Sequence, residues 1–284
     1  MLYAGVKFEL FFIYQIMDKF IKECERGNLE LAKQILQDNP SINISAYDDA
    51  FCIACERGRL EVAKWLFEIK PSIDVSADNN LVFRHTCHGG HLEVAKWLIK
   101  IRPDINISAL DDDAFRHACT YGHLKVAKWL FEINPTIDVS ARTDYAFRFT
   151  CENGHLGVAK WLIKIKHSID ISSFDEFAFR YACRNGHLKI AKWLIKTKPS
   201  INISASQDNA FCAACIDGHL NVAKWLIEVK PTIDVSAHND RAFHRTCLNG
   251  HLEIAKWLCT LNDDYTIALV SGQITGSIYE TKMP

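Results

Sequence analysis

The stretch Gly122-His123-Leu124-Lys125-Val126-Ala127-Lys128-Trp129-Leu130 returns in close copies along almost the whole chain. Its glycine and its tryptophan each step by 32 residues, at Gly58, Gly90, Gly122, Gly154, Gly186, Gly218 and Gly250 and at Trp65, Trp97, Trp129, Trp161, Trp193, Trp225 and Trp257. The series contains every tryptophan of the chain, so this large aromatic is a repeat component and does not mark a unique pocket. Self-similarity at this period predicts a solenoid.

A first helix is predicted upstream of each glycine. In the copy around residue 115, Ala114, Phe115, Ala118 and Cys119 form one apolar stripe at helical spacing. An acidic or amide residue precedes the stripe in every copy and suits an N-cap that accepts the first free amides. These residues are Asp48, Asn80, Asp112, Asp144, Glu176, Asp208 and Asp240. The repeat glycine is expected to end this helix in a left-handed conformation.

A second helix is predicted directly after the glycine. Its buried face is expected to contain Leu124, Val126, Ala127, Leu130 and Phe131, while the lysines point to water. The proline at 135 stops it, because proline cannot continue the helical hydrogen bonds. Residues 137–141 are then expected to form a short extended arm that leads to the next repeat.

The sequence G-H-L-x-V-A-K-W-L followed by P-x-I-D-V-S-A resembles the ankyrin repeat, over about Asp18 to Leu261. The resemblance implies an all-α, ankyrin-type solenoid of helix-turn-helix repeats with short hairpin arms. It departs from the family where Asp113-Ala114-Phe115-Arg116 replaces Thr-Pro-Leu-His and where Asn134 replaces a glycine. The repeat is also one residue shorter than usual, which we assign to the hairpin turn. The K-W-L version resembles repeats of large DNA viruses of amoebae.

Three segments are predicted along the chain. Residues 18–261 form about eight repeats, and their first copy is degenerate and polar, as a terminal cap must be. Residues 1–17 are an apolar extension, too short and too charged to span a bilayer, and the working start is expected at Met17. Residues 262–284 are a tail that is expected to cover the open end. With 33 basic and 34 acidic residues, the chain carries no electrostatic footprint for nucleic acid or a membrane.

Cysteine and histidine are interpreted as repeat components. Seven of the eleven cysteines recur at the small apolar position of the first helix, where a free thiol packs as a small hydrophobe. Cys52 and Cys212 create C-x-x-C pairs, but no second pair stands nearby, so we predict no metal site and no cofactor. Regular reduced thiols favour an intracellular protein, cytoplasmic or nuclear. Histidine follows the glycine in six copies, which favours a structural hydrogen bond over catalysis.

Two rows of cations also repeat. The first row is a lysine that recurs in each second helix. In three copies it lies three residues after a glutamate, namely Glu61, Glu93 or Glu253, and this spacing favours surface ion pairs over an anion-binding track. An arginine recurs in the first helix of four consecutive copies, where the resemblance places a residue that braces neighbouring turns. These arginines are Arg84, Arg116, Arg148 and Arg180.

Taken together, the sequence predicts a non-catalytic module or scaffold that binds another protein through the concave surface of first helices and hairpins. Alternatives are an adaptor subunit that recruits a target to a larger assembly and, less favoured, a metal protein or enzyme. Positions that vary between copies are free to meet a partner, and copies four to six gather aromatic residues there. The predicted partner-binding residues are His85, His88, Asp111, His117, Thr120, Tyr121, Tyr145, Phe149, Glu152, Asn153, Phe174, Phe177, Tyr181 and Arg184. The patch is centred on Tyr121, Phe149 and Tyr181.

Overall fold

The computed structural model describes residues 2–40, 45–270 and 273–278. It divides into two compact units, Met1–Asp138 and Val139–Pro284. Unit 1 contains α1 (Leu2–Arg26), α2 (Leu29–Asp38), α3 (Ser45–Glu56), α4 (Leu60–Ile69), α5 (Ala77–His88), α6 (Leu92–Ile101), α7 (Ala109–Thr120) and α8 (Leu124–Ile133). Unit 2 contains α9 (Ala141–Glu152), α10 (Leu156–Ile165), α11 (Ser173–Arg184), α12 (Leu188–Thr197), α13 (Ala205–Ile216), α14 (Leu220–Val229), α15 (Ala237–Leu248), α16 (Leu252–Leu258), β1 (Tyr265–Val270) and β2 (Gln273–Ile278).

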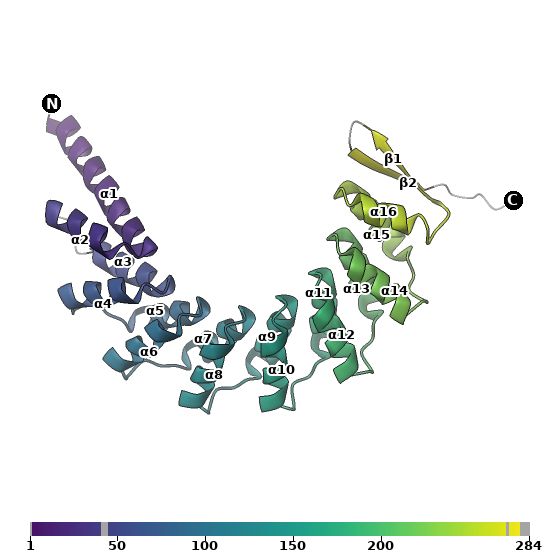
Figure 1. Ribbon diagram of the computed structural model, residues 1–284, viewed down its shortest axis with the longest axis horizontal. Helices are drawn as coiled ribbons and strands as arrows, with labels where there is room; N and C mark the ends of the chain where they lie inside the picture. Colours follow the sequence, from purple (N-terminus) through teal and green to yellow (C-terminus); the bar gives the residue numbers. More distant parts are fainter. Residues whose placement is uncertain (1, 41–44, 271–272, 279–284) are drawn as a thin grey trace. The chain divides into compact units, whose positions relative to one another are not determined.

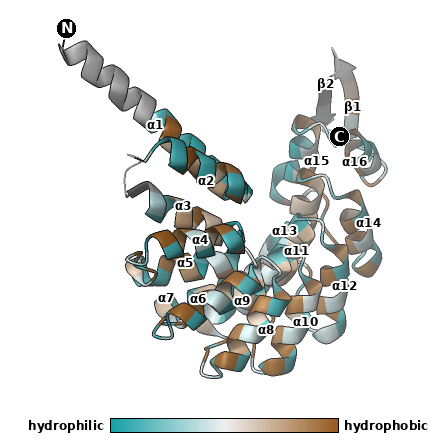
Figure 2. Ribbon diagram, turned by 60° about the vertical axis from the view of Figure 1, so that its left-hand side comes forward, coloured by the Kyte–Doolittle hydropathy of each residue, from teal (hydrophilic) through white to brown (hydrophobic). Residues whose placement is uncertain are grey.

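Within each unit, the helices alternate between two rows (Figure 1). Odd-numbered helices are the first helices of the repeats, and even-numbered helices are the second helices. Each helix carries both hydrophobic and hydrophilic residues, as a helix buried on one face requires (Figure 2). In the copy around residue 115, the first-helix residues Phe115 and Cys119 and the second-helix residues Ala127 and Leu130 are fully buried. The predicted helix pair is therefore confirmed.

The glycine that ends each first helix adopts the expected left-handed conformation. Gly122 has a φ of +81°. Its N–H donates to Cys119 O at 3.0 Å, and the N–H of His123 donates to Ala118 O at 2.8 Å. These two bonds form the Schellman motif, which satisfies carbonyls that a helix end leaves free. The second helix then runs to Ile133, directly before Asn134 and Pro135, as predicted.

The starts of the first helices from α5 to α15 differ from the expected extended arm. In α7 the three residues Leu110, Asp111 and Asp112 have φ values of 55°, 58° and 58°, which places them in left-handed backbone. Such backbone costs about 1–2 kcal/mol for each residue that is not glycine, so a turn of three costs about 3–6 kcal/mol. The same turn begins α5, α9, α11, α13 and α15. The sequence analysis did not predict this turn, because glycine is the usual sign of left-handed backbone and these residues are not glycines.

The residues predicted as N-caps have another role. The carboxylate of Asp112 accepts a hydrogen bond from the backbone N–H of Asp138 at 3.0 Å, 26 residues further along. Glu176 accepts in the same way from Asn202 at 3.1 Å, and Asp208 from Asp234 at 3.2 Å. The prediction was therefore wrong about the function of these side chains. They tie the start of an arm to the turn that begins the same repeat.

The tryptophans pack on the first helix of the preceding repeat, but most are only half-buried. The Trp129 ring lies 6.4 Å from that of Phe83, and Trp193 lies 6.4 Å from Phe147. Trp225 is the exception, with 8% of its surface exposed. The tryptophans therefore lie at the interfaces between repeats, with part of each ring exposed in most copies.

The N-terminal extension continues the first repeat without a break. Helix α1 runs from Leu2 across Met17 to Arg26. Phe20 and Cys24, near its end, are fully buried. The side chains of residues 1–13, which include most of the apolar residues of the extension, lie outside the described part of the structure. Among the described helices, none is both long enough and apolar enough to cross a lipid bilayer.

The tail folds as a β-hairpin that packs against α15. Strands β1 and β2 pair antiparallel, with Tyr265 opposite Ile278. The Tyr265 ring stacks on Phe243 with 4.2 Å between centroids, and its hydroxyl donates to Asp240 Oδ1 at 2.5 Å. Tyr265 thus packs on Phe243 at the place where, in earlier repeats, the tryptophan of the next copy packs on the equivalent phenylalanine. The sequence analysis predicted no strands, because this segment lies outside the repeat.

We propose that this hairpin is the C-terminal cap, and we expect Tyr265→Ala to loosen the last repeat. The substitution removes the ring that stacks on Phe243 and the hydroxyl that donates to Asp240. In a solenoid each repeat depends on its nearest neighbours. Amide hydrogen exchange in α15 and α16 should therefore become faster, while exchange in α9 and α10 stays unchanged. Asp263→Ala, at an exposed neighbouring residue, is the control. Unchanged exchange in α15 would contradict a capping role.

Candidate functional site

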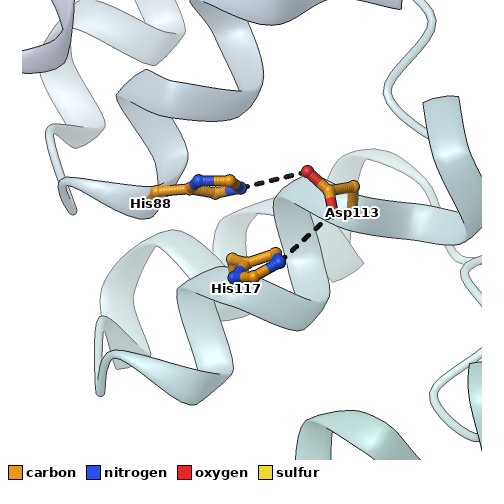
Figure 3. A group of neighbouring side chains, drawn as sticks. All are labelled: His88, Asp113 and His117. Atoms are coloured by element: carbon orange, nitrogen blue, oxygen red, sulfur yellow. Dashed lines mark hydrogen bonds and ion pairs between the residues drawn. The ribbon is translucent and has the colours of Figure 1, made fainter.

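In unit 1, the buried carboxylate of Asp113 collects four cationic or polar side chains. Arg84 Nη1 donates to its Oδ2 at 2.8 Å, and Arg116 Nη2 donates to its Oδ1 at 3.1 Å. His88 Nε2 lies 3.1 Å from Oδ2, and His117 Nε2 lies 3.3 Å from Oδ1. Figure 3 shows both imidazoles directed at the carboxylate, His88 from the end of α5 and His117 from α7.

These interactions set the charge of the group. Burial alone would raise the pKa of Asp113, but hydrogen bonds from His117, His88 and Arg84 outweigh burial and hold that pKa well below its usual range. Burial lowers the pKa of His88, more than the neighbouring Asp113 raises it. At neutral pH the cluster therefore contains an ionised Asp113, two arginines and a neutral His88.

The arginine row braces the left-handed turns, as the sequence predicted, although each side chain holds the turn of its own repeat. Arg116 donates to the carbonyls of Asp111 at 2.7 Å and Leu110 at 3.0 Å. Arg180 makes the same pair of bonds to Asp175 at 2.6 Å and Phe174 at 3.1 Å. Helices α13 and α15 keep the turn with other residues in the arginine position, namely Cys212 and His244. The turn therefore does not require an arginine at this position.

His88, Asp113 and His117 are also spaced as metal ligands, since their donor atoms lie within 4.8 Å of one another. Two imidazoles and a carboxylate are a common ligand set for transition metals. Here, however, both carboxylate oxygens already accept hydrogen bonds from arginines. A guanidinium about 5 Å from a divalent ion adds roughly 7 kcal/mol of repulsion at an effective dielectric constant of about 20. The arginines therefore favour a hydrogen-bonded cluster over a metal site at these residues.

Purified chain under reducing conditions is expected to hold substoichiometric zinc. Arginine repulsion opposes a cation at Asp113, and burial raises the pKa of the C-x-x-C thiols Cys52 and Cys212 to about 11, so both stay protonated. Elemental analysis after dialysis against a zinc buffer measures the stoichiometry. A tight one-to-one site that His117→Ala removes would contradict this prediction and place a metal at the cluster.

Around Asp113, three half-buried histidines and an exposed tyrosine contact one another on the surface of unit 1. The rings of His85 and His88 stack at 5.3 Å, those of His88 and His117 lie 4.2 Å apart, and Tyr121 stacks on His117 at 5.8 Å. Tyr121 exposes 51% of its surface. We call these four residues the histidine–tyrosine surface.

In unit 2, four aromatic rings form a continuous row across α9 and α11, which we call the aromatic ladder. Tyr145 stacks on Phe149 at 4.1 Å, Phe149 contacts Phe177 at 5.4 Å, and Phe177 stacks on Tyr181 at 4.1 Å. The Arg148 guanidinium lies over this row, 5.1 Å from the Phe177 ring.

The ladder is a surface feature. On the same helices Phe147 and Phe179 are fully buried, whereas all four ladder rings are half-buried. Next to the ladder, Phe174 exposes 56% of its surface, and the Arg148 guanidinium lies 4.2 Å from its ring. Aromatic rings that a core does not use are available for contact with another molecule.

The structure distributes the predicted partner-binding residues over both units. Tyr121 belongs to unit 1, and Phe149 and Tyr181 belong to unit 2, so the predicted patch becomes two surfaces described separately. Asp111, Asn153 and Arg184 are exposed, and Glu152 is half-buried, with a pKa that burial raises. The prediction that Thr120 binds a partner was wrong, because this residue is buried. It is 95% buried, given its exposed fraction of 5%, and its hydroxyl donates to Arg116 O at 2.9 Å.

The histidine after each glycine has the structural role that its recurrence predicted. His123 makes a hydrogen bond to the backbone of His88, and His187 makes one to the backbone of Glu152. A Cβ added at Gly90 would collide with the His123 ring, so the glycine is required by space as well as by its left-handed φ of +78°. These histidines therefore join adjacent repeats.

The lysine row forms the surface ion pairs that its spacing predicted. Lys64 lies 2.8 Å from Glu61, Lys96 lies 3.4 Å from Glu93, and Lys256 lies 3.2 Å from Glu253. Exposed pairs of this kind contribute at most about 1 kcal/mol each. On the surface of the first helices, in contrast, the aromatic side chains are held in place by contacts with one another.

Two residues were missed in the sequence analysis, Asp113 and Arg241. Both occupy the repeat position that holds Tyr145 and Phe177 in copies five and six. This position varies between copies, and the comparison that selected Tyr145 and Phe177 would also have selected these two. They were passed over because that comparison favoured aromatic residues.

A comparison with protein families matches the chain to a model described as ankyrin repeats (3 copies), over residues 20–109, 51–143, 115–207 and 181–268. A solved structure similar to the chain is the crystal structure of the human ASB11 ankyrin repeat domain, with 17% sequence identity and a TM-score of 0.49. That match covers 70% of this chain and 96% of the other. A search of curated proteins gave no match. Because the family model covers nearly all of the repeats, the chain belongs to the ankyrin repeat family.

Proposed function

We propose that this chain is a non-catalytic module that binds a partner protein through its first helices and the turns that precede them. Ankyrin repeats are protein–protein interaction modules, typically without catalytic activity. An intracellular location remains a prediction from the reduced cysteines.

The aromatic ladder is the observation that carries this proposal. Tyrosine, tryptophan and arginine are the residues that most often dominate interface energy. Phe149, Phe177 and Tyr181 already contact one another, and Arg148 lies over Phe177. A partner would therefore meet side chains that are already ordered, which lowers the entropic cost of binding. The histidine–tyrosine surface supports a second contact in unit 1, with Tyr121 as its most exposed ring.

A pull-down from cells of the native host, followed by mass spectrometry, identifies the partner, and calorimetric titration with the purified partner then tests the surface. Phe177→Ala and Tyr181→Ala should each weaken binding by about tenfold or more, as for hot-spot residues, with an unchanged circular dichroism spectrum. Tyr121→Ala tests the contribution of unit 1 in the same way. Lys160→Ala, at an exposed residue of α10, is the control and should change nothing. The reverse pattern would move the site to the lysine row.

A further inference from the structure

Three arginines of unit 2 line one small cavity beside the aromatic ladder. Arg180 and Arg184 come from α11, and Arg241 comes from α15, with α13 between them (Figure 1). Tyr181, Cys212 and Asp217 also line the cavity, whose volume is about 180 Å³. We call this cavity the arginine pocket.

The positive charge of the pocket is only partly neutralised. Arg184 Nε donates to Asp217 Oδ2 at 3.0 Å, and Asp217 is the one carboxylate among the lining residues. Arg180 donates only to backbone carbonyls, which carry no net charge. Arg241 is exposed and, in the described part of the chain, has no hydrogen bond or ion pair. Two guanidinium groups therefore lack an anionic partner, and planar guanidinium groups bind carboxylates and phosphates with paired hydrogen bonds.

Size and surroundings decide what kind of anion fits. Pockets for small molecules measure roughly 300–1,000 Å³, well above this cavity, so a single acidic side chain suits it better than a whole metabolite. Tyr181 belongs both to the pocket and to the aromatic ladder, which makes the two continuous. In a polypeptide bound to the ladder, a side chain next to those that contact the ladder would enter the pocket.

We propose that the arginine pocket is the subsite for one acidic side chain of the partner protein, next to apolar or aromatic residues that contact the ladder. The inference rests on the proposed function, because it assumes that a polypeptide occupies the ladder. It adds the chemistry of the partner: an acidic segment that also carries apolar side chains.

Selection of random peptides displayed on phage against the full chain supplies the probe. Enriched peptides are synthesised with a fluorophore, and their dissociation constants are measured by fluorescence anisotropy at about 0.15 M salt. We expect enrichment of aspartate or glutamate at one position beside an aromatic or aliphatic residue. Arg241→Ala should weaken the binding of such peptides by about tenfold or more, as for loss of a charge-assisted hydrogen bond.

Two further variants test the local charge, and the second of them separates a contact in the pocket from general electrostatics. Asp217→Asn removes the competing carboxylate and should tighten binding severalfold, the opposite of Arg241→Ala. Arg245→Ala removes the same charge one turn further along α15, at an exposed residue that does not line the pocket, and should change binding by less than about twofold. Replacing the acidic residue of the peptide by its amide should abolish the effect of Arg241→Ala, which is the signature of direct coupling.

Other outcomes overturn the proposal in distinguishable ways. Peptides without acidic enrichment that lose binding in Phe177→Ala but not in Arg241→Ala would remove the subsite and leave the proposed function intact. Peptides insensitive to both variants would contradict both. Binding of a single-stranded oligonucleotide that Arg241→Ala abolishes would assign the pocket to phosphates of nucleic acid instead. Exchanging the acidic residue for phosphoserine shows whether the preferred acid is a carboxylate or a phosphate.

Discussion

Replacing Phe83 by alanine is expected to lower the free energy of unfolding by about 3–5 kcal/mol, the usual cost of truncating a fully buried phenylalanine. Phe83 has no exposed surface and contacts the ring of Trp129 in the next repeat. Its loss leaves a cavity inside one repeat and removes contact area from the interface with another. Urea unfolding followed by circular dichroism measures the change.

The comparison with tryptophan makes this prediction specific. Trp129 is half-buried whereas Phe83 is fully buried, so Trp129→Ala should cost clearly less than Phe83→Ala. Trp225→Ala should cost more than Trp129→Ala, because only 8% of Trp225 is exposed. The double variant Phe83→Ala/Trp129→Ala should reveal a coupling of about 0.5–1.5 kcal/mol for the aromatic pair. Equal losses at both positions would show that repeat stability does not follow burial.

Periodicity predicted the helices well because each repeat is a complete pattern. The apolar stripe, Gly122 and Pro135 each impose a local constraint that no neighbouring repeat can override. The left-handed turn at Leu110 to Asp112 is different. Aspartate tolerates that backbone but leucine does not, and the bonds from Arg116 and from the arm come from five residues or more away. Such a turn is stabilised by tertiary contacts, which a local pattern does not encode.

The candidate sites were predictable only in part, for a related reason. Variation between copies identified the aromatic residues of the ladder, because each stands out from the repeat by its own side chain. Asp113 gains its role from four partners that lie on two helices, and Arg241 gains its role from Arg180 and Arg184 two repeats earlier. A charge cluster depends on distances between elements. The sequence supplies the residue types but not those distances.

The Asp113 cluster leads to the last prediction, a large loss of stability that depends on pH. In Asp113→Ala, Arg84 and Arg116 keep their bonds to turn carbonyls but lose the carboxylate that neutralises them. Removing one member of a buried ion network typically costs about 3–5 kcal/mol. We expect a loss of that size at pH 7 in urea unfolding. Asp104→Asn, at an exposed carboxylate of the same unit, should change stability by less than about 0.5 kcal/mol.

The pH dependence separates charge from packing. Folding lowers the pKa of Asp113. At a pH below the ordinary value of 3.8 for this carboxyl group, the unfolded chain therefore binds a proton there more readily than the folded chain does. The contribution of Asp113 is then fully present above that pH and declines as the pH falls below it. The difference in stability between the native chain and Asp113→Ala should therefore not shrink between about pH 7 and pH 5, where Asp113 favours protonation of His88, and should shrink below about pH 4. A difference that stays the same throughout the acid range would assign the loss to the cavity left by the side chain and not to its charge.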